Sequence, residues 1–480
     1  MVAGRRTTNL TSSTTLDEVV GNKAVSGTPK SRKATIANFA AQLVASGPVH
    51  DALTARICAP QEFGALGVGG DDTDALLEWA EACQAGNRQP YVPPGIYNCS
   101  AQLDFSSKGG AILGGGENLS IIRFTAAGGG FKCYPTSSPY GVFSLDRIGL
   151  QAYGAVVTKA VDVVLPNDGA YSNNFRVGFR NVELLGLSGG YFATGVRERN
   201  VSYSERRKVK YWGSSADAGA GGAYYAGVAW DFDTQVVSDD PALGLSLENI
   251  WDGCSVAFAD TAIKARGFPE GLHFTNNNLA FVRKGIDAVM QTGTRQPFAN
   301  VMGNHINATE FAILLDRINQ SQIIGNHISR PNGVHAYIWD GIHLDDSLNA
   351  IVANNIIVPE IVSLTAGDTT GLRLEGDSWY AIVDGNQFVG AITGSFKPLT
   401  TAIRLETGVQ MTKIGNNNQY TQTITTPFSD GSGNTTNGQP GITIQKAGVT
   451  QGVAGMVSLI DFNADFNIAV SGGSASVDIV

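Results

Sequence analysis

Residues 299–328 read ANVMGNHINATEFAILLDRINQSQIIGNHI and contain two copies of the motif that decides the fold. The motif places Ile or Val shortly before Gly-Asn, or before Asn-Asn in some copies. Counted in residue numbers, the intervals between neighbouring copies are 22, 29, 31 and 30, and a weaker copy precedes the first by 27. The asparagines that these copies share are Asn277, Asn304, Asn326, Asn355, Asn386 and Asn416.

A second motif runs out of phase with the first and has the same period. Its copies read AILLD at 312–316, GIHLD at 341–345, GLRLE at 371–375 and AIRLE at 402–406. The intervals between their inner positions are 29, 30 and 31, at Ile313, Ile342, Leu372 and Ile403. The two motifs share one period, and this period has the length of a solenoid repeat. They therefore indicate coils stacked in register. The sequence therefore predicts a parallel β-helix, with equivalent residues of successive coils about 4.8 Å apart.

Such stacking would align the asparagines of the first motif into a ladder. We expect this ladder to lie in the turns, because asparagine tolerates the left-handed backbone and can bond neighbouring amides. Its role is predicted to be structural rather than catalytic.

Composition agrees with a turn-rich β protein. The chain has 480 residues, of which 43% are apolar, 16% are charged and 59 are glycine, unlike a coiled coil or a disordered tail. No apolar run reaches about 18 residues, and the first residues lack the apolar core of a signal peptide. Five cysteines without metal-type spacing predict free thiols rather than disulfides or a zinc site.

Charge is distributed unevenly along the chain. The net charge is −9, but residues 1–33 carry +4, which leaves −13 for the remainder. An acidic body argues against nucleic acid as a partner. The basic arm would suit an acidic protein surface, although a merely solvated arm is the alternative.

Residues 63–97 read FGALGVGGDDTDALLEWAEACQAGNRQPYVPPGIY. Asp71 or Asp72 can cap a helix that Gly86 ends, and 91–97 predict a strand, a turn and a strand. The helix is expected to bury Leu76, Leu77, Ala80 and Cys83. This succession resembles the first segment of the pectate-lyase-like right-handed β-helix superfamily, which is common in bacteriophage tailspikes. The resemblance implies an all-β, right-handed solenoid whose first coil is closed by a capping helix.

Four parts follow from these patterns. Residues 1–57 are expected to form an arm and a helical neck, and 58–105 the first strands with the capping helix. Residues 106–425 would form the coils, with an insertion near 203–240, and 426–480 a small β cap. The resemblance implies that the first part attaches to the virion and that the last supports a homotrimer.

The second motif directs carboxylates outward, in a column formed by Asp316, Asp345, Glu375 and Glu406. Arginines two residues earlier would neutralise the last two, whereas Asp345 has only His343 beside it. The least compensated stretch is therefore 316–375, where a raised carboxyl pKa is expected. Carboxyls on neighbouring coils would be about 5 Å apart and those on alternate coils about 9–10 Å, which suits glycoside hydrolysis. A solvated charged face is the alternative.

Neighbouring side chains suggest how a sugar would be held. Tyr337 and Trp339 precede one copy of the motif and Trp379 follows another. Exposed aromatic rings stack on sugar faces, while His343 and Arg373 would bond hydroxyl groups. The alternative for both tryptophans is a place in the core.

A rival site lies in the predicted insertion. Asp231 and Asp233 alternate on one strand face, with α-carbons about 6.6–6.8 Å apart, which is inside the range for inverting hydrolysis. Calcium is an alternative, since Asp239 and Asp240 add further oxygen ligands. A polysaccharide lyase would instead need a basic residue. Lys264 and Arg266 are expected to point outward, in register with the outward carboxylates of the second motif.

The resemblance implies a phage tailspike that binds a bacterial surface polysaccharide, and the carboxylate pattern favours its depolymerisation by glycoside hydrolysis. Its catalytic candidates are Asp345, Glu375, Asp316, Asp231 and Asp233. No cofactor or metal is expected, and a phage tail, baseplate or adaptor protein would bind the N-terminus. Such a protein is made in the host cytoplasm and acts from the virion at the cell surface. A binding-only tail protein and a lyase are the competing hypotheses.

Overall fold

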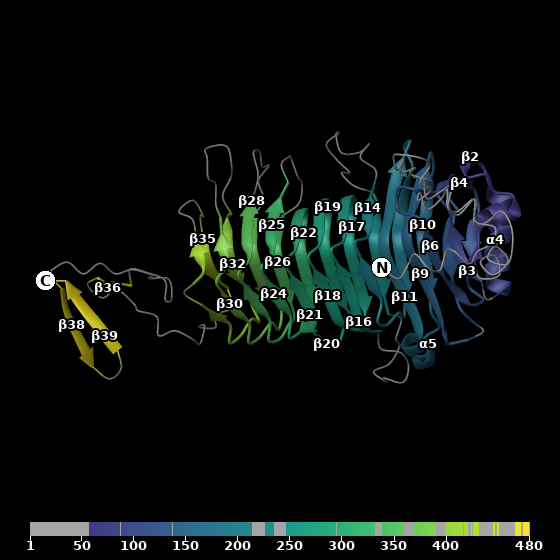
Figure 1. The fold of residues 1–480 in the computed structure, drawn as a ribbon. Helices are drawn as coiled ribbons and strands as arrows, with labels where there is room; N and C mark the ends of the chain where they lie inside the picture. Colours follow the sequence, from purple (N-terminus) through teal and green to yellow (C-terminus); the bar gives the residue numbers. More distant parts are fainter. Residues whose placement is uncertain are drawn as a thin grey trace, which may run out of the picture.

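The computed structural model describes residues 57–86, 88–136, 138–213, 226–234, 246–293, 295–331, 338–359, 369–389, 399–415, 417–420, 424 and 426–431, and four short strands nearer the C-terminus. Figure 1 shows a solenoid of stacked coils that begins at helix α4 (Thr73–Ala85) and continues to strand β35 (Thr426–Asp430). The strands of successive coils pair in parallel and form three long faces. No described helix has the length and hydropathy to span a bilayer.

The first face carries the residues of the second sequence motif. Its strands, in order of pairing, are β5 (Gln102–Asp104), β8 (Gly130–Cys133), β10 (Val156–Val164), β12 (Tyr191–Arg199), β15 (Val228–Asp233), β17 (Ser255–Gly267), β19 (Asn278–Met290), β22 (His305–Asp316), β26 (Trp339–Asp345), β29 (Thr369–Glu375), β32 (Thr401–Leu405) and β35.

The second face leads into the asparagine turns. Its strands are β1 (Ile57–Cys58), β3 (Gln89–Val92), β6 (Gly109–Gly114), β9 (Gly141–Tyr153), β11 (Phe175–Leu187), β13 (Glu205–Arg207), β16 (Ser246–Asp252), β18 (Pro269–Thr275), β21 (Ala299–Met302), β24 (Gln322–Ile324), β27 (Ile351–Ala353), β30 (Ile382–Asp384) and β33 (Lys413–Ile414).

The third face contains shorter strands and parts of the long ones. The C-terminal halves of β9 and β11 and the N-terminal parts of β17, β19 and β22 belong to it. Its remaining strands are β2 (Val68–Asp71), β4 (Gly95–Cys99), β7 (Ser120–Phe124), β14 (Lys210–Trp212), β25 (His327–Arg330), β28 (Ile356–Pro359), β31 (Gln387–Phe388) and β34 (Gln419–Tyr420).

A few short elements lie outside these faces. They are η3 (Pro60–Phe63), α5 (Gly169–Asn174), the paired strands β20 (Gln296–Pro297) and β23 (Ile318–Asn319), and two antiparallel pairs, β36 (Gln445–Lys446) with β37 (Val449–Thr450) and β38 (Phe466–Ser471) with β39 (Ser474–Ile479). The sequence predicted strands in this C-terminal region. Their role as a cap or trimerisation segment stays a prediction, and the arm and neck within 1–56 lie outside the described residues.

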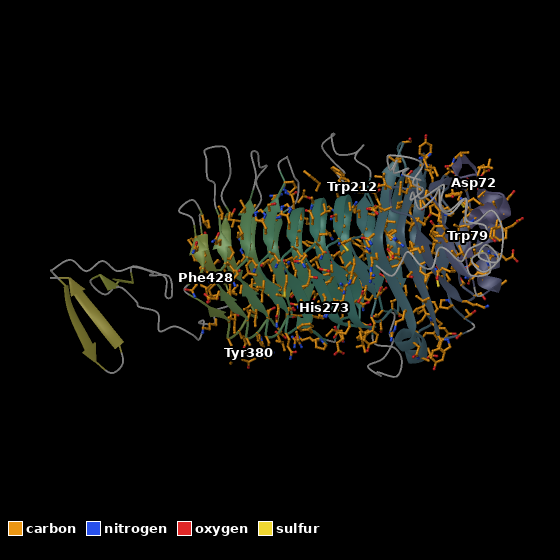
Figure 2. All side chains as sticks on the ribbon, in the orientation of Figure 1. Asp72, Trp79, Trp212, His273, Tyr380 and Phe428 are labelled. Atoms are coloured by element: carbon orange, nitrogen blue, oxygen red, sulfur yellow. The ribbon has the colours of Figure 1, made fainter. Side chains whose placement is uncertain are left out.

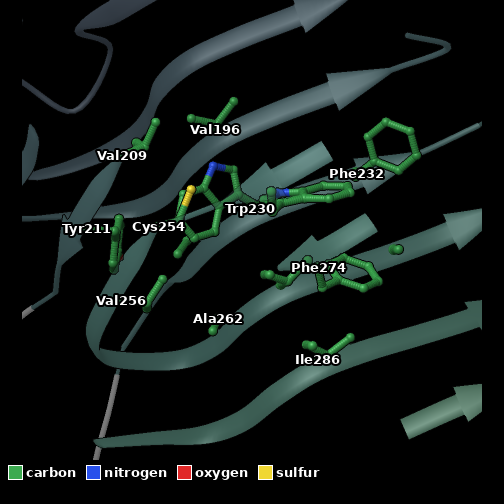
Figure 3. Close-up of a cluster of buried hydrophobic side chains, with 14 of the residues drawn as sticks. Val196, Val209, Tyr211, Trp230, Phe232, Cys254, Val256, Ala262, Phe274 and Ile286 are labelled. Carbon is green, nitrogen blue, oxygen red and sulfur yellow. The ribbon is translucent and has the colours of Figure 1, made fainter. Parts of the chain in front are cut away.

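Apolar side chains fill the interior between the three faces. Near the first coils, Phe105, Phe131 and Phe143 pack with ring centroids 5.8–6.4 Å apart. Farther along, Trp251 stacks on Phe274 with ring centroids 4.9 Å apart. Figure 3 shows Phe274 with other buried side chains of this part of the core, among them Trp230 and Phe232. All five cysteines are buried free thiols, as predicted. The core is therefore one continuous column rather than a set of separate cores.

The capping helix forms where the sequence predicted it and ends at Gly86. Asp71 accepts a hydrogen bond from the Thr73 amide, whereas Asp72 accepts from the amides of Leu66 and Gly67 and so fixes the preceding loop. The expected buried stripe is correct except that Leu77 is 38% exposed. Trp79, which the stripe omitted, is fully buried, and its indole N–H donates to the Cys58 carbonyl oxygen.

Residues 203–213 do not form the interruption that the sequence predicted. Strands β13 and β14 pair on both sides with neighbouring coils, and β15 does the same on the first face. The segment looked irregular because it buries charge: Arg206 and Glu198 form an ion pair at 2.5 Å inside the solenoid. Only 214–225 and 235–245 of this region lie outside the described residues.

Buried asparagines form the predicted ladder. The Oδ1 atom of Asn355 accepts from the backbone N–H and the Nδ2 of Asn326, and its own Nδ2 donates to Ile323 O and to Asn386. The same pattern runs from Asn277 to the last rung. That last rung is Asn418, so the sequence assignment of Asn416, which lies outside the described residues, is wrong.

The left-handed position in these turns is the residue before each rung. It is occupied by Asn276, Gly303, Gly325, Asn354 and Gly385, all with φ between 56° and 69°. The sequence reasoning had assigned that backbone to the rungs themselves. The side-chain amides of the rungs instead lie inside the solenoid, where each inner rung forms hydrogen bonds with residues of both neighbouring coils.

A second buried column contains only small residues and bends each strand of the first face. It consists of Ala160, Gly195, Ala229, Ala262, Gly285, Ala312, Gly341, Gly371 and Ala402. A Cβ on Gly341 would lie 3.0 Å from the buried Ile357 side chain, so this position faces inward. The next residue, Ile342, is also buried. Two consecutive inward residues break the alternation of the strand.

The ladder predicts a large loss of stability when one rung is removed. Asn355→Ala leaves buried donors on Asn326 and an acceptor on Ile323 unpaired, which should lower the free energy of unfolding by about 3 kcal/mol. Denaturant unfolding measures this loss. The control is Gln387→Ala, an exposed strand residue, for which a change within about 0.5 kcal/mol is expected. Equal losses in both variants would contradict a structural role for the ladder.

The small column predicts a second, steric effect. In Gly371→Ala the new Cβ would lie 2.6 Å from the Phe388 ring and 2.7 Å from the Ala402 carbonyl oxygen. We expect a loss of about 1–3 kcal/mol. Gly178→Ala is the matched control, because its Cβ would meet nothing closer than 3.8 Å and should be tolerated. A tolerated Gly371→Ala would mean that the bend is not sterically required.

Candidate functional site

The register of the first face agrees with the second sequence motif. Ile313, Ile342, Leu372 and Ile403 pair in order and are fully buried. The pairing also aligns Asp316 with Asp345 and Asp345 with Glu375. These three carboxylates therefore form a continuous outward column, which we call the acidic column.

The same columns continue toward the N-terminus. Asp233 is aligned with Arg266, Arg266 with Val289 and Val289 with Asp316. Asp231 and Asp233 therefore lie on the same face as the acidic column, three coils from Asp316, or about 14 Å. Their outward direction agrees with the sequence prediction, but the segment that carries them is an ordinary strand of this face, β15, rather than part of an insertion.

Basic side chains on neighbouring coils neutralise Asp231 and Asp233. Arg199 lies between them, 2.7 Å from Asp231 and 3.6 Å from Asp233, and Lys264 approaches Asp231 at 3.6 Å. Burial nevertheless raises the pKa of Asp233, since it outweighs the attraction of Arg199. Asp239 and Asp240, the other calcium candidates, lie outside the described residues. Within the described ranges no group of three or more His, Cys, Asp or Glu side chains could hold a metal.

Lys264 and Arg266, the lyase candidates, point outward from β17 as expected. Arg266 donates to the side chain of Asp287 at 2.8 Å and to its carbonyl oxygen at 2.6 Å. Lys264 has Asp231 beside it. Both cations are thus engaged with acidic neighbours on adjacent coils.

Glu375 is held by two basic side chains. Its Oε1 lies 2.9 Å from Nε2 of His343, and its Oε2 lies 2.5 Å from Nη2 of Arg373. The hydrogen bond with His343 is the main reason that the pKa of Glu375 is lowered, and Arg373 adds to it. Arg373 also approaches Glu406 at 3.5 Å. Glu375 is therefore ionised at neutral pH.

Asp316 and Asp345 have the opposite environment. The pKa of Asp316 is raised to about 6, mainly by burial and in part by the charge of Asp345, even though Arg317 lies 2.7 Å away and lowers it. The pKa of Asp345 is also raised, by burial first and by the charges of Glu375 and Asp346 second. The acidic column thus contains carboxyls whose proton affinities differ strongly.

The sequence reasoning missed a fourth carboxylate, Asp340. It is 8% exposed, and its Oδ2 lies 3.6 Å from Nδ1 of His343 and 3.7 Å from Nη1 of Arg373. Burial raises its pKa. Strict alternation from Ile342 would place Asp340 inside the solenoid, but the bend at Gly341 turns it outward. The recurrence of Gly or Ala just before the inner Ile or Leu, at 341, 371 and 402, is the signal that reveals this bend.

The aromatic candidates are placed differently from one another. Trp339 is fully buried, and its indole N–H donates to the Ala308 carbonyl oxygen, so the prediction that it stacks on a ligand is wrong. Its side chain fills the interior beside the column of small residues. Trp379 is half-buried, and its N–H donates to Gly408 O at 3.0 Å. Tyr337 lies outside the described residues.

Comparison with known proteins identifies the fold. No protein-family model matches the sequence, and no curated protein matches it. The A-module of the mannuronan C-5 epimerase AlgE6 from Azotobacter vinelandii has a TM-score of 0.53 at 15% identity, covering 78% of this chain and 98% of that one.

The tailspike protein of E. coli bacteriophage HK620 is also similar, with a TM-score of 0.50 at 11% identity, covering 90% of this chain and 93% of that one. Both comparisons extend over most of the solenoid. The chain has the right-handed parallel β-helix fold of phage tailspikes and related β-helix proteins.

Proposed function

We propose that this chain is a phage tailspike that binds a bacterial surface polysaccharide and cleaves it by glycoside hydrolysis. The observation that carries the proposal is the acidic column, where an ionised Glu375 and a more basic Asp316 lie on one rigid face. Pairs of carboxyls with separated pKa values supply the acid and the base of such reactions.

The assignment of roles follows from the two environments. Asp316, with a pKa of about 6, retains a proton in mildly acidic solution and would donate it to the glycosidic oxygen. Glu375 would accept a proton from water, whose oxygen forms the new bond to the anomeric carbon while the glycosidic bond breaks. Two coils separate the pair, about 9–10 Å, close to the distance in inverting enzymes. Asp345 lies between them on the intervening coil.

His343, Arg373 and Asp340 act through Glu375 in this proposal. His343 lies between Asp340 and Glu375, and Arg373 contacts both of these carboxylates. These contacts hold the Glu375 carboxylate in one orientation. Because Arg373 and His343 are already engaged by acids, we expect them to be positioning residues more than direct sugar ligands.

Tail attachment and assembly belong to the same proposal. Residues 1–57 would bind a tail, baseplate or adaptor protein, the C-terminal strands would support a homotrimer, and the protein would be located on the virion.

Sedimentation of the full chain and of a chain lacking 426–480 tests the assembly. Trimers that persist without this segment would contradict its role.

The carboxylate assignment predicts two inactive variants. Asp316→Asn and Glu375→Gln should each lower kcat by about 10²–10⁴, because each removes one proton transfer. The rate is measured as new reducing ends on a polysaccharide that the wild-type protein binds, and binding should persist. Asp104→Asn, which removes a carboxylate on the same face near the first coil, is the control and should retain the wild-type rate.

Three results would contradict parts of this assignment. Wild-type rates in both variants would mean that the acidic column is not the site. Products that absorb ultraviolet light as unsaturated sugars would identify a lyase and transfer the role to Lys264 or Arg266. Saturable binding without any cleavage would make the protein a binding spike.

The two pKa directions predict the pH profile. Asp316 must be protonated, so kcat should fall as pH rises above about 6. Glu375 must be ionised, and because its pKa is lowered, activity should persist below pH 4.5, its unperturbed value. Initial rates over a pH series measure both limits. A profile that rises through pH 6 would exclude Asp316 as the proton donor.

A further inference from the structure

Three aromatic side chains lie on successive coils at the corner between the third and first faces. Phe258 and Phe281 stack with ring centroids 5.5 Å apart and an interplanar angle of 11°. Trp212 contacts Phe258 from the other side, with ring centroids 6.1 Å apart and the rings tilted by 42°. Trp212 is 39% and Phe281 47% exposed. We call these three residues the aromatic platform.

Both phenylalanines of the platform have a strained backbone conformation. Phe258 has φ 59° and Phe281 has φ 52°, in the left-handed region that bulky residues rarely adopt. The asparagine corner uses only Gly and Asn at its left-handed positions, where the strain is small. Phe281 is nearly half exposed in this conformation, so burial offsets its strain less than it would in the core. Other bulky residues of the described chain, such as Phe298 and Tyr380, have the same backbone conformation, so it is the stacking of the rings that distinguishes the platform.

Charged side chains on successive coils lie beside the platform. Two residues after each phenylalanine, Asp260 and Arg283 pair at 2.6 Å, and Arg283 also contacts Glu310 on the next coil. These planar groups are fixed by one another and present donors and acceptors beside the rings. An aromatic face bordered by fixed polar groups fits a sugar ring, which has apolar faces and hydroxyl edges.

The platform and the acidic column are connected through the same strands. Phe281 and Asp287 both belong to β19, and Asp316 and Asp345 lie on the next two coils of the first face. Phe281 is therefore two coils from Asp345, about 10 Å along the solenoid axis, and eight residues of β19, up to about 26 Å, separate it across the face from Val289, which aligns with Asp316. A polymer that crosses these coils obliquely can contact both places.

We propose that the aromatic platform is an accessory subsite that binds a pyranose polysaccharide through the faces of its sugar rings. This inference rests on the proposed function for its ligand, but not on cleavage. A nucleic acid would also stack on the rings, yet Arg283 is neutralised by two acids and the whole chain carries −9. The subsite would retain the polymer while the acidic column acts on a sugar several rings away along the same chain.

Phe281→Gly tests the platform because it removes the ring without straining the backbone. Glycine accepts the left-handed backbone, so the variant loses the ring while the melting temperature should change by no more than a few degrees. Tyr380→Gly is a matched control, since Tyr380 is 48% exposed with φ 60° and lies on the opposite margin of the solenoid from Trp212 in Figure 2. Trp212→Ala provides an independent change on the same platform.

The probe is an array of purified bacterial O-antigens, capsular polysaccharides and exopolysaccharides. For the polymer that the wild-type protein binds, Phe281→Gly and Trp212→Ala should each raise Kd about threefold to tenfold, and Tyr380→Gly less than twofold. If the polymer is cleaved, the two platform variants should raise KM and leave kcat unchanged. Wild-type affinity in both platform variants, or an equal loss in Tyr380→Gly, would overturn the inference.

The two proposals can fail separately. Binding that weakens in Phe281→Gly without cleavage by the wild-type protein would support the platform and overturn the hydrolase. Cleavage with unchanged Kd and KM in the platform variants would do the reverse. If no polysaccharide binds the wild-type chain and a protein partner does, both proposals are wrong.

Discussion

Register between coils is the constraint on which the rest of the structure depends. Parallel strands alone would tolerate a shift of the stack, but the buried amides of the asparagine ladder cannot shift without losing four hydrogen bonds at each inner rung. Fixed register places Asp316, Asp345 and Glu375 in one column and Phe258 over Phe281 in another. Both candidate sites are consequences of coil stacking, because no single coil contains either of them.

Repetition explains how much could be predicted from the sequence. The coils, the ladder and the outward positions of the acidic column repeat with one period, so several copies support each assignment. Asp340 and Trp339 were misjudged because they lie at or before the bend at Gly341, where alternation fails. Asn418 was misplaced because three asparagines occur together in the last copy. Partners across coils, such as Arg199 with Asp231, depend on rotamers that a repeat does not specify.

Charge on the first face shows why one stretch differs from the others. From β10 to β19 acids and bases alternate between coils, as in Asp162, Arg197, Asp231, Lys264 and Asp287. In the parallel column two residues farther along each strand, Arg199, Asp233 and Arg266 alternate in the same way. Val289 ends that alternation, and Asp316 and Asp345 then follow each other directly. Like charges about 5 Å apart are unfavourable, and this repulsion adds to burial in raising the pKa values of both carboxyls. The functional asymmetry of the acidic column arises from this break in an otherwise neutral pattern.

A rigid solenoid also explains how strain can be maintained at the aromatic platform. Each phenylalanine in a left-handed conformation costs about 1–2 kcal/mol, which a mobile loop would relieve by rearranging. Here β17 and β19 are long strands paired with neighbours over most of their length, so the corner cannot relax without breaking many ladder hydrogen bonds. The rings are therefore preorganised, and a bound polymer would lose little of its binding energy in ordering the protein. Because the same strands continue to the acidic column, the distance between the two surfaces is fixed before any ligand arrives.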